Sequence, residues 1–110
     1  MANDSRLGGR TRLALNAKVR ARHQPCPLCG YAIDPTLPRT GKPHPLSSVI
    51  DEWLPRSKGG QVDEHNCVEM HRICNAIKWN HWPVTPDLAE RCRQAVQAHQ
   101  PTEPPPLTTW

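Results

Sequence analysis

Two pairs of potential metal ligands stand far apart in the chain, Cys26-x-x-Cys29 and His71-x-x-Cys74. A CxxC turn directs two thiolates toward one ion, and a tetrahedral zinc site needs a second pair of ligands. The second pair repeats the two-residue gap, whereas the alternative, Cys67 with Cys74, has a less usual gap of six residues. We therefore predict a structural Zn²⁺ site with no open position for chemistry. Its predicted ligands are Cys26, Cys29, His71 and Cys74.

The elements that must position these ligands are short. Turn signals and hydrophobic spacing predict one small α+β domain. The predicted order is a basic amphipathic helix at 10–22, the CxxC turn at 25–30, a proline-rich loop at 31–46, strands at 48–53 and 61–70, and helices at 72–79 and 87–99. Thr85-Pro86 is a capping pair for the last helix. We divide the chain into an N-terminal arm (1–24), a zinc-stapled core (25–82) and a C-terminal helix with a proline-rich tail (83–110).

The composition explains why a metal is needed. A chain of 110 residues with 36% hydrophobic residues and no Phe supports only a small core, which usually requires disulfides or a metal. Five cysteines are an odd number, so metal ligation in a reducing compartment is the better interpretation. We expect Cys67 and Cys92 to pack in the core, together with Trp53, Trp79 and Trp82. Without an apolar span or a secretory signal, we expect a cytoplasmic protein with no membrane association.

Positive charge is concentrated at the N-terminus. Residues 1–23 contain six Lys/Arg and one Asp, a net charge of +5, whereas the remainder holds eight against nine, a net charge of −1. A basic arm favours a polyanionic partner, most often nucleic acid, although solvated charges would look the same. The residues expected to contact DNA phosphates are Arg10, Arg12, Lys18, Arg20, Arg22, Arg56, Lys58, Arg72 and Lys78.

The segment between the two ligand pairs carries four motifs. They are Asp51-Glu52 at the end of the predicted strand, Pro55-Arg56-Ser57-Lys58-Gly59-Gly60, Asn66, and Cys74-Asn75-x-x-Lys78. In this order they resemble the zinc-stapled HNH endonuclease family, in the small form found beside packaging genes of tailed phages. The resemblance covers about residues 10–80. It implies a ββα-metal (His-Me finger) fold, in which a hairpin and a helix surround one catalytic divalent cation.

The resemblance also implies roles for single residues. Asp51 and Asn75 would ligate the catalytic cation, and Asn66 would bridge the hairpin loop through hydrogen bonds to its backbone. Carboxylate and amide oxygens suit Mg²⁺ or Mn²⁺, which would act as a Lewis acid on the scissile phosphate. The family further implies DNA as substrate, contacted mostly at phosphates, and a host-cell cytoplasmic role in phage genome packaging. The large terminase and other packaging proteins are the implied partners.

One position departs from the family pattern. The family has a histidine after the aspartate as general base, whereas this chain has Glu52. An ordinary carboxylate, with a pKa of about 4.3, is a weaker base than imidazole near pH 7. Glu52 is our first candidate for the base, and it would alternatively be a further metal ligand. His44, which precedes the same strand, is the second candidate for the base, ahead of His65 and His81.

Two other functions stay open at this stage. If neither Glu52 nor His44 is a base, the chain would be a weak or inactive nuclease, acting as a zinc-stapled DNA-binding or terminase-associated adaptor. A purely structural zinc scaffold is the third interpretation, but it leaves Asp51 and Asn75 without a role.

Overall fold

The computed structural model describes residues 8–100, so residues 1–7 of the predicted arm and the predicted tail at 101–110 lie outside the described part. The α+β class expected from the sequence is confirmed. The described elements are α1 (Gly9–Arg20), β1 (Ser48–Glu52), the short 3-10 helix η2 (Arg56–Lys58), β2 (Cys67–His71), α2 (Arg72–Lys78) and α3 (Pro86–His99).

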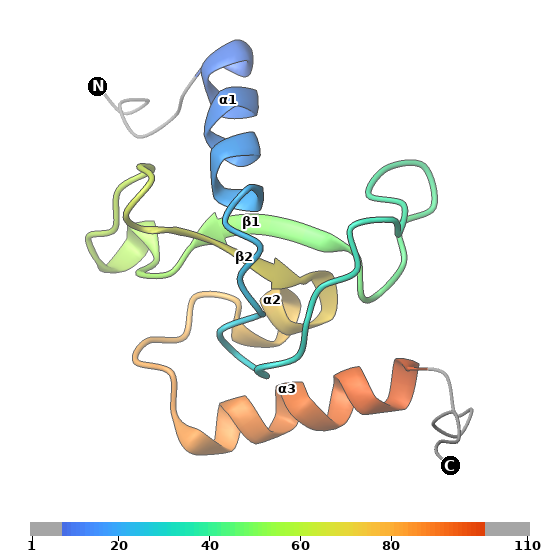
Figure 1. Ribbon diagram of the computed structural model, residues 1–110. Coiled ribbons are helices and arrows are strands. Elements are labelled where there is room, and N and C mark those ends of the chain that lie inside the picture. The colour runs from blue at the N-terminus through green and yellow to red at the C-terminus, as the bar shows by residue number, and fades with distance from the viewer. Residues whose placement is uncertain (1–7, 101–110) are drawn as a thin grey trace.

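The two strands form an antiparallel hairpin, and α2 begins at the residue after β2 ends. The register pairs Ser48 with His71 at one end and Glu52 with Cys67 at the other. The second strand is shorter than predicted, because residues 61–66 belong to the loop instead. The α1 helix covers one face of the hairpin and α2 the other, with α3 outside α2 (Figure 1).

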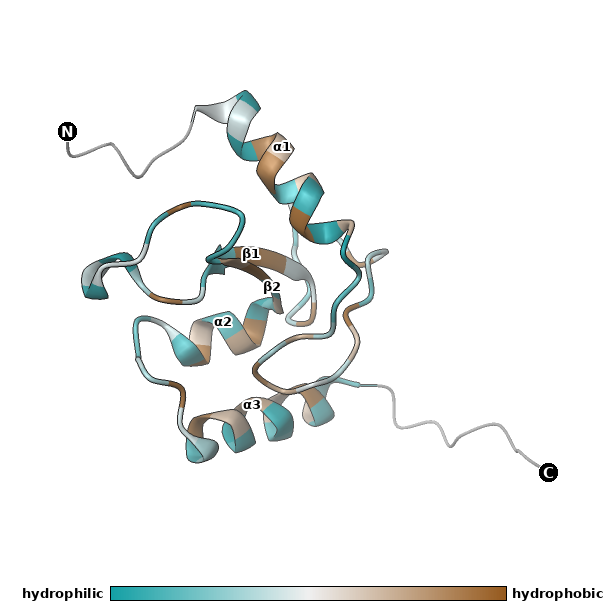
Figure 2. Cartoon of the chain, turned by 60° about the vertical axis from the view of Figure 1, so that its left-hand side comes forward, coloured by the Kyte–Doolittle hydropathy of each residue, from teal (hydrophilic) through white to brown (hydrophobic). Residues whose placement is uncertain are grey.

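Alternation along the strands divides the apolar residues into two clusters. Ile50 and Cys67 face α1 and pack with Val19 and Val62. The larger cluster lies on the α2 side and contains Leu28, Leu46, Met70, Leu88, Cys92 and Val96. Figure 2 shows the hydrophobic strands between the helices and the mixed, largely hydrophilic surface of α1. Cys67 and Cys92 are fully buried, one in each cluster, as predicted.

The last helix forms where the sequence predicted it. The Thr85 hydroxyl accepts a hydrogen bond from the Leu88 N–H at 3.2 Å, and Pro86 occupies the first turn, where a missing N–H costs nothing. Its inner face is formed by Leu88, Cys92 and Val96, which are buried.

The tryptophans depart from the prediction of a common core. Trp53 is partly buried, but Trp82 is largely at the surface and the Trp79 side chain is 71% exposed. The reason for Trp79 is that α2 ends at Lys78. The backbone then turns away from the helical path, with a φ of 48° at Trp79.

Candidate functional site

The four predicted zinc ligands meet in one buried cluster. The ligand atoms of Cys26, Cys29, His71 and Cys74 all lie within 4.8 Å of one another. His71 Nδ1 is 3.3 Å from Cys29 Sγ and 3.8 Å from Cys74 Sγ. Ligands about 2.0–2.3 Å from a tetrahedral zinc lie about 3.3–3.8 Å apart, and these two separations match that range. It could hold a structural metal such as zinc.

Backbone hydrogen bonds fix the shape of the CxxC turn. The Gly30 N–H donates to the Cys26 carbonyl at 2.7 Å, and Gly30 has a φ of 82°, which glycine adopts without strain. The Tyr31 N–H points at Cys29 Sγ at 3.5 Å. On the other side, His71 Nε2 lies 3.1 Å from the Ala32 carbonyl, which leaves Nδ1 for the metal. Such a second partner orients a ligating imidazole.

The thiols influence one another's ionisation. A hydrogen bond from Cys74 lowers the pKa of Cys26 to about 3, whereas burial raises the pKa of Cys29 to about 11. The interaction with Cys26 raises the pKa of Cys74 far above its ordinary value. The ionisation of one thiol therefore disfavours the ionisation of its neighbours in this small space. A divalent cation would remove that conflict, because it stabilises every thiolate around it.

Asp51 and Glu52 lie at the other end of the hairpin and border an open hollow of about 320 Å³. The Asp51 carboxylate accepts a hydrogen bond from the Glu52 N–H at 2.8 Å. The hollow is lined by Asp51, Glu52, Pro55, Arg56, Ser57, Trp79 and Asn80. It therefore combines oxygen donors, a guanidinium group and an exposed aromatic ring.

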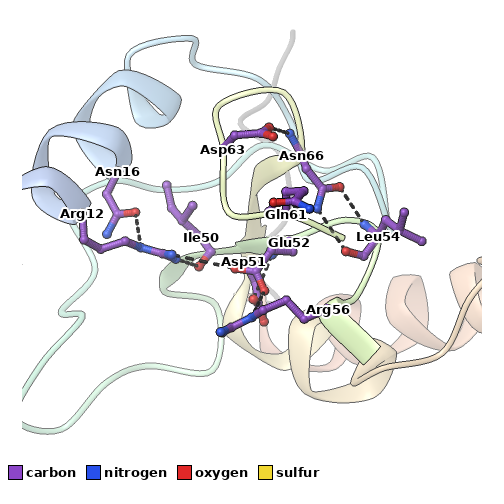
Figure 3. A network of polar contacts seen from close by, with 10 residues as sticks. All are labelled: Arg12, Asn16, Ile50, Asp51, Glu52, Leu54, Arg56, Gln61, Asp63 and Asn66. Atoms are coloured by element: carbon purple, nitrogen blue, oxygen red, sulfur yellow. Dashed lines mark hydrogen bonds and ion pairs between the residues drawn. The ribbon is translucent and has the colours of Figure 1, made fainter. Parts of the chain in front are cut away.

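Two arginines from different elements hold Glu52, which is only 8% exposed (Figure 3). Arg56 Nε lies 3.4 Å from one carboxylate oxygen, and Arg12 Nη1 lies 3.8 Å from the other. Arg12 also donates to the Ile50 carbonyl at 3.2 Å, which fixes α1 on the hairpin. Burial, followed by the charge of Asp51, raises the pKa of Glu52, and the two arginines oppose this shift without cancelling it.

Asn66 ties the loop that follows β1. Its side-chain oxygen accepts from the Leu54 N–H at 2.9 Å, and its amide donates to the carbonyls of Leu54 (3.0 Å) and Gln61 (2.9 Å) (Figure 3). These are the bonds to loop backbone that the resemblance implied for Asn66. Gly60 is enclosed by the same loop, where a Cβ would lie 1.7 Å from the Leu54 carbonyl oxygen. The loop is therefore closely packed around Gly60.

His44 and Asn75 do not line this hollow. His44 precedes the opposite end of β1, which places a strand of about 13 Å between it and Glu52. Its Nδ1 accepts from the Leu46 N–H at 2.9 Å, and it lines a separate hollow beside His71. Asn75 lies in α2, and within residues 8–100 it is Asn80 that borders the hollow beside Asp51. The structure thus places His44 and the acidic pair at different hollows.

The basic residues of α1 contact the hairpin instead of forming a free arm. Lys18 pairs with Glu64 at 2.5 Å, and Arg20 lies 4.0 Å from Glu69. Arg22 donates to the Glu64 carbonyl at 2.8 Å. Arg10, Lys58 and Arg72 are exposed. Arg12, Lys18 and Arg20 thus lie beside carboxylates of the hairpin and its connecting loop.

Lys78 was expected at a phosphate, but its side chain is 1% exposed and cannot reach one. Its Nζ lies 5.6 Å from the ring centroid of Trp53 and 5.9 Å from that of Trp82. Burial lowers the pKa of Lys78, and the nearby charges of Asp51 and Glu52 oppose this. No spacing in the sequence indicates this pairing, because only folding brings the segment between α2 and α3 against Trp53.

No protein family, curated protein or solved structure matches this chain. Within the described residues, no helix is long and apolar enough to cross a membrane.

Proposed function

We propose that this chain is a metal-dependent DNA endonuclease with a ββα-metal centre, associated with phage genome packaging. One observation carries the proposal. Asp51 and Glu52 stand at the open end of a β1–β2–α2 unit, beside a hollow that also contains a guanidinium group. The motif order of the HNH family supports the same assignment. A metal bound by the buried Cys26, Cys29, His71 and Cys74 cluster, at the opposite or closed end of the hairpin, would hold the unit together.

The oxygen donors of the hollow fit a hard divalent cation such as Mg²⁺ or Mn²⁺. Asp51 would hold that ion, with Asn75 as the second ligand that the family pattern implies; Asn80, which lines the hollow, is the local alternative. When bound, the ion supplies Lewis-acid stabilisation to the scissile phosphate and its leaving oxygen.

Glu52 is the proposed general base. It accepts a proton from a water molecule as the water oxygen bonds to phosphorus and the sugar oxygen leaves. Burial beside Asp51 raises the pKa of Glu52, which makes it a stronger base than an exposed glutamate. Arg12 and Arg56 orient the carboxylate through their ion pairs. His44 is too far from Asp51 along β1 to share this role.

The two ion pairs of Glu52 also favour a second candidate function. A carboxylate held by two arginines would serve equally well as a structural residue. The chain would then be a catalytically inactive adaptor that binds DNA or the large terminase. Cleavage assays distinguish this adaptor from a nuclease.

Plasmid nicking with Mg²⁺, Mn²⁺ or Ni²⁺ tests the nuclease proposal. We expect the wild-type chain to nick supercoiled DNA and Asp51→Ala to lose this activity. Asp87→Ala, which removes an exposed carboxylate in the first turn of α3, is the matched control and should cut like the wild type. Absence of cutting with every ion would reject the nuclease and leave the adaptor.

The identity of the base follows from two further variants. Glu52→Gln keeps the shape of the side chain but cannot accept the proton, so we expect a drop of about 10²–10⁴-fold in the cleavage rate. His44→Ala should cut at the wild-type rate. Full activity in Glu52→Gln would show that another group accepts the proton.

A further inference from the structure

Trp79 is the most exposed large apolar side chain on the described surface, at 71%. It borders the same hollow as Asp51 and Glu52, together with Asn80 and Arg56. Leu13 is similarly exposed, at 70%, but it lies on α1 and does not line the hollow. Most of the Trp79 indole is exposed beside the Asp51 and Glu52 carboxylates, where a bound ligand would cover it.

The backbone holds the indole in place instead of leaving it on a loose loop. The Trp79 N–H donates to the Asn75 carbonyl at 2.9 Å, and the His81 N–H donates to the Lys78 carbonyl at 2.8 Å. The His81 ring stands edge-on to the indole, with the centroids 6.0 Å apart. A φ of 48° is strained for a bulky side chain, and such strain concentrates at functional sites.

The loop with η2 and the segment between α2 and α3 lie on the same side of the molecule in both views (Figures 1 and 2). The ring is therefore presented next to the place where the proposed chemistry would occur. Arg56 borders the same hollow, and its guanidinium group, which is paired with Glu52, brings a positive charge beside the ring. An aromatic platform beside a cation is the arrangement by which proteins bind unpaired nucleotides.

We propose that Trp79 stacks on an unpaired nucleobase adjacent to the scissile phosphate, so that the preferred substrate is single-stranded or locally unpaired DNA. In a duplex the faces of the bases are covered by their neighbours, and only an unpaired or extruded base can offer a face to the indole. This inference rests on the proposed function and names its substrate class.

Binding of short oligonucleotides to the full chain tests the inference. The experiment uses Asp51→Ala, which should bind without cutting, and measures fluorescence anisotropy with labelled oligothymidine and with a fully paired, blunt-ended linear duplex. Adding Trp79→Ala should weaken single-strand binding about 5- to 150-fold, the range for one lost stacking contact, and change duplex binding less than about 2-fold. Trp79→Phe should restore most of the affinity. Leu13→Ala should have no effect.

An abasic oligonucleotide provides a second arm, because it keeps the phosphates and removes the base faces. It should bind the Asp51→Ala chain as weakly as oligothymidine binds the Trp79→Ala double variant. Equal losses for single strand and duplex, or no loss for either, would overturn the stacking role even if plasmid nicking succeeds. Failure of the Asp51→Ala chain to bind any DNA would instead count against the proposed function itself.

Discussion

The two ends of one short hairpin differ in how they use polar side chains. At the Ser48–His71 end, four ligand side chains converge in a buried cluster whose positions would all be taken by one zinc ion. At the Glu52–Cys67 end, two carboxylates border an open hollow that a solvent molecule or a phosphate can enter. The first arrangement suits a structural staple, and the second leaves room for a substrate.

The two ends also differ in where their partners come from. The zinc cluster is built from two pairs of ligands with short sequence gaps, each pair shaped by its own turn or helix start. The acidic end depends on α1 and on η2, which supply Arg12 and Arg56. The comparison therefore predicts that damage to the closed end abolishes the fold, whereas damage to the open end changes activity more than stability.

Loss of one zinc ligand should have the largest effect. Cys74→Ser should lose the zinc and the folded state, because apparent zinc affinities of about 10–16 kcal/mol support folding in small zinc domains. Circular dichroism and metal analysis of the purified protein measure both. The matched control is Cys67→Ala, which removes an equally buried thiol from the smaller hydrophobic cluster beside α1. This variant should keep one zinc per chain. A Cys74→Ser protein with full zinc content would refute the assignment.

Gly60→Ala should be the next most damaging change, at the loop of the open end. The added methyl group would meet the Leu54 carbonyl at 1.7 Å, so the loop must move. We expect a loss of about 1–3 kcal/mol in the free energy of unfolding, measured with urea. Gly9→Ala, where nothing lies within 4 Å of the new atom, should be neutral or slightly stabilising. Equal stability of the two variants would mean that the loop has room for the added methyl group.

Asn66→Ala removes three hydrogen bonds from the same loop. The Leu54 N–H and two carbonyls lose their partner, but water can reach this partly exposed site and replace part of the interaction. We expect a loss of about 1–2 kcal/mol in the free energy of unfolding. Zinc content should stay at one per chain, because the cluster lies at the opposite end. Release of zinc by this variant would contradict the separation of the two ends.

Arg12→Ala should have the smallest effect on stability. Its ion pair with Glu52 and its bond to the Ile50 carbonyl are partly exposed, so we expect a cost of about 1 kcal/mol that shrinks in high salt. Arg10→Ala, which removes an exposed arginine from the same helix, is the control. Thermal melts at low and high salt compare the two variants. An Arg12→Ala cost that does not change with salt would show that charge is not the cause.

The ligands of the closed end could be predicted from the sequence because the motifs that contain them are local. The CxxC turn, the repeated gap of His71-x-x-Cys74 and the Thr85-Pro86 cap each lie within a few residues, and all three are present. The contacts of the open end are long-range. No spacing reveals that Arg12 would reach Glu52, that Lys78 would be buried under Trp53, or that Trp79 would be exposed. These depend on how α1 and the α2–α3 segment pack on the hairpin.

Metal stoichiometry tests the division between the two ends most directly. Native mass spectrometry of the full chain, purified and dialysed and then supplied with Mn²⁺, counts both ions. We predict one zinc that survives dialysis and one exchangeable Mn²⁺. Asp51→Ala should lose only the Mn²⁺, and Cys74→Ser should lose the zinc. A wild-type chain without zinc, or with Mn²⁺ binding unchanged in Asp51→Ala, would contradict the account.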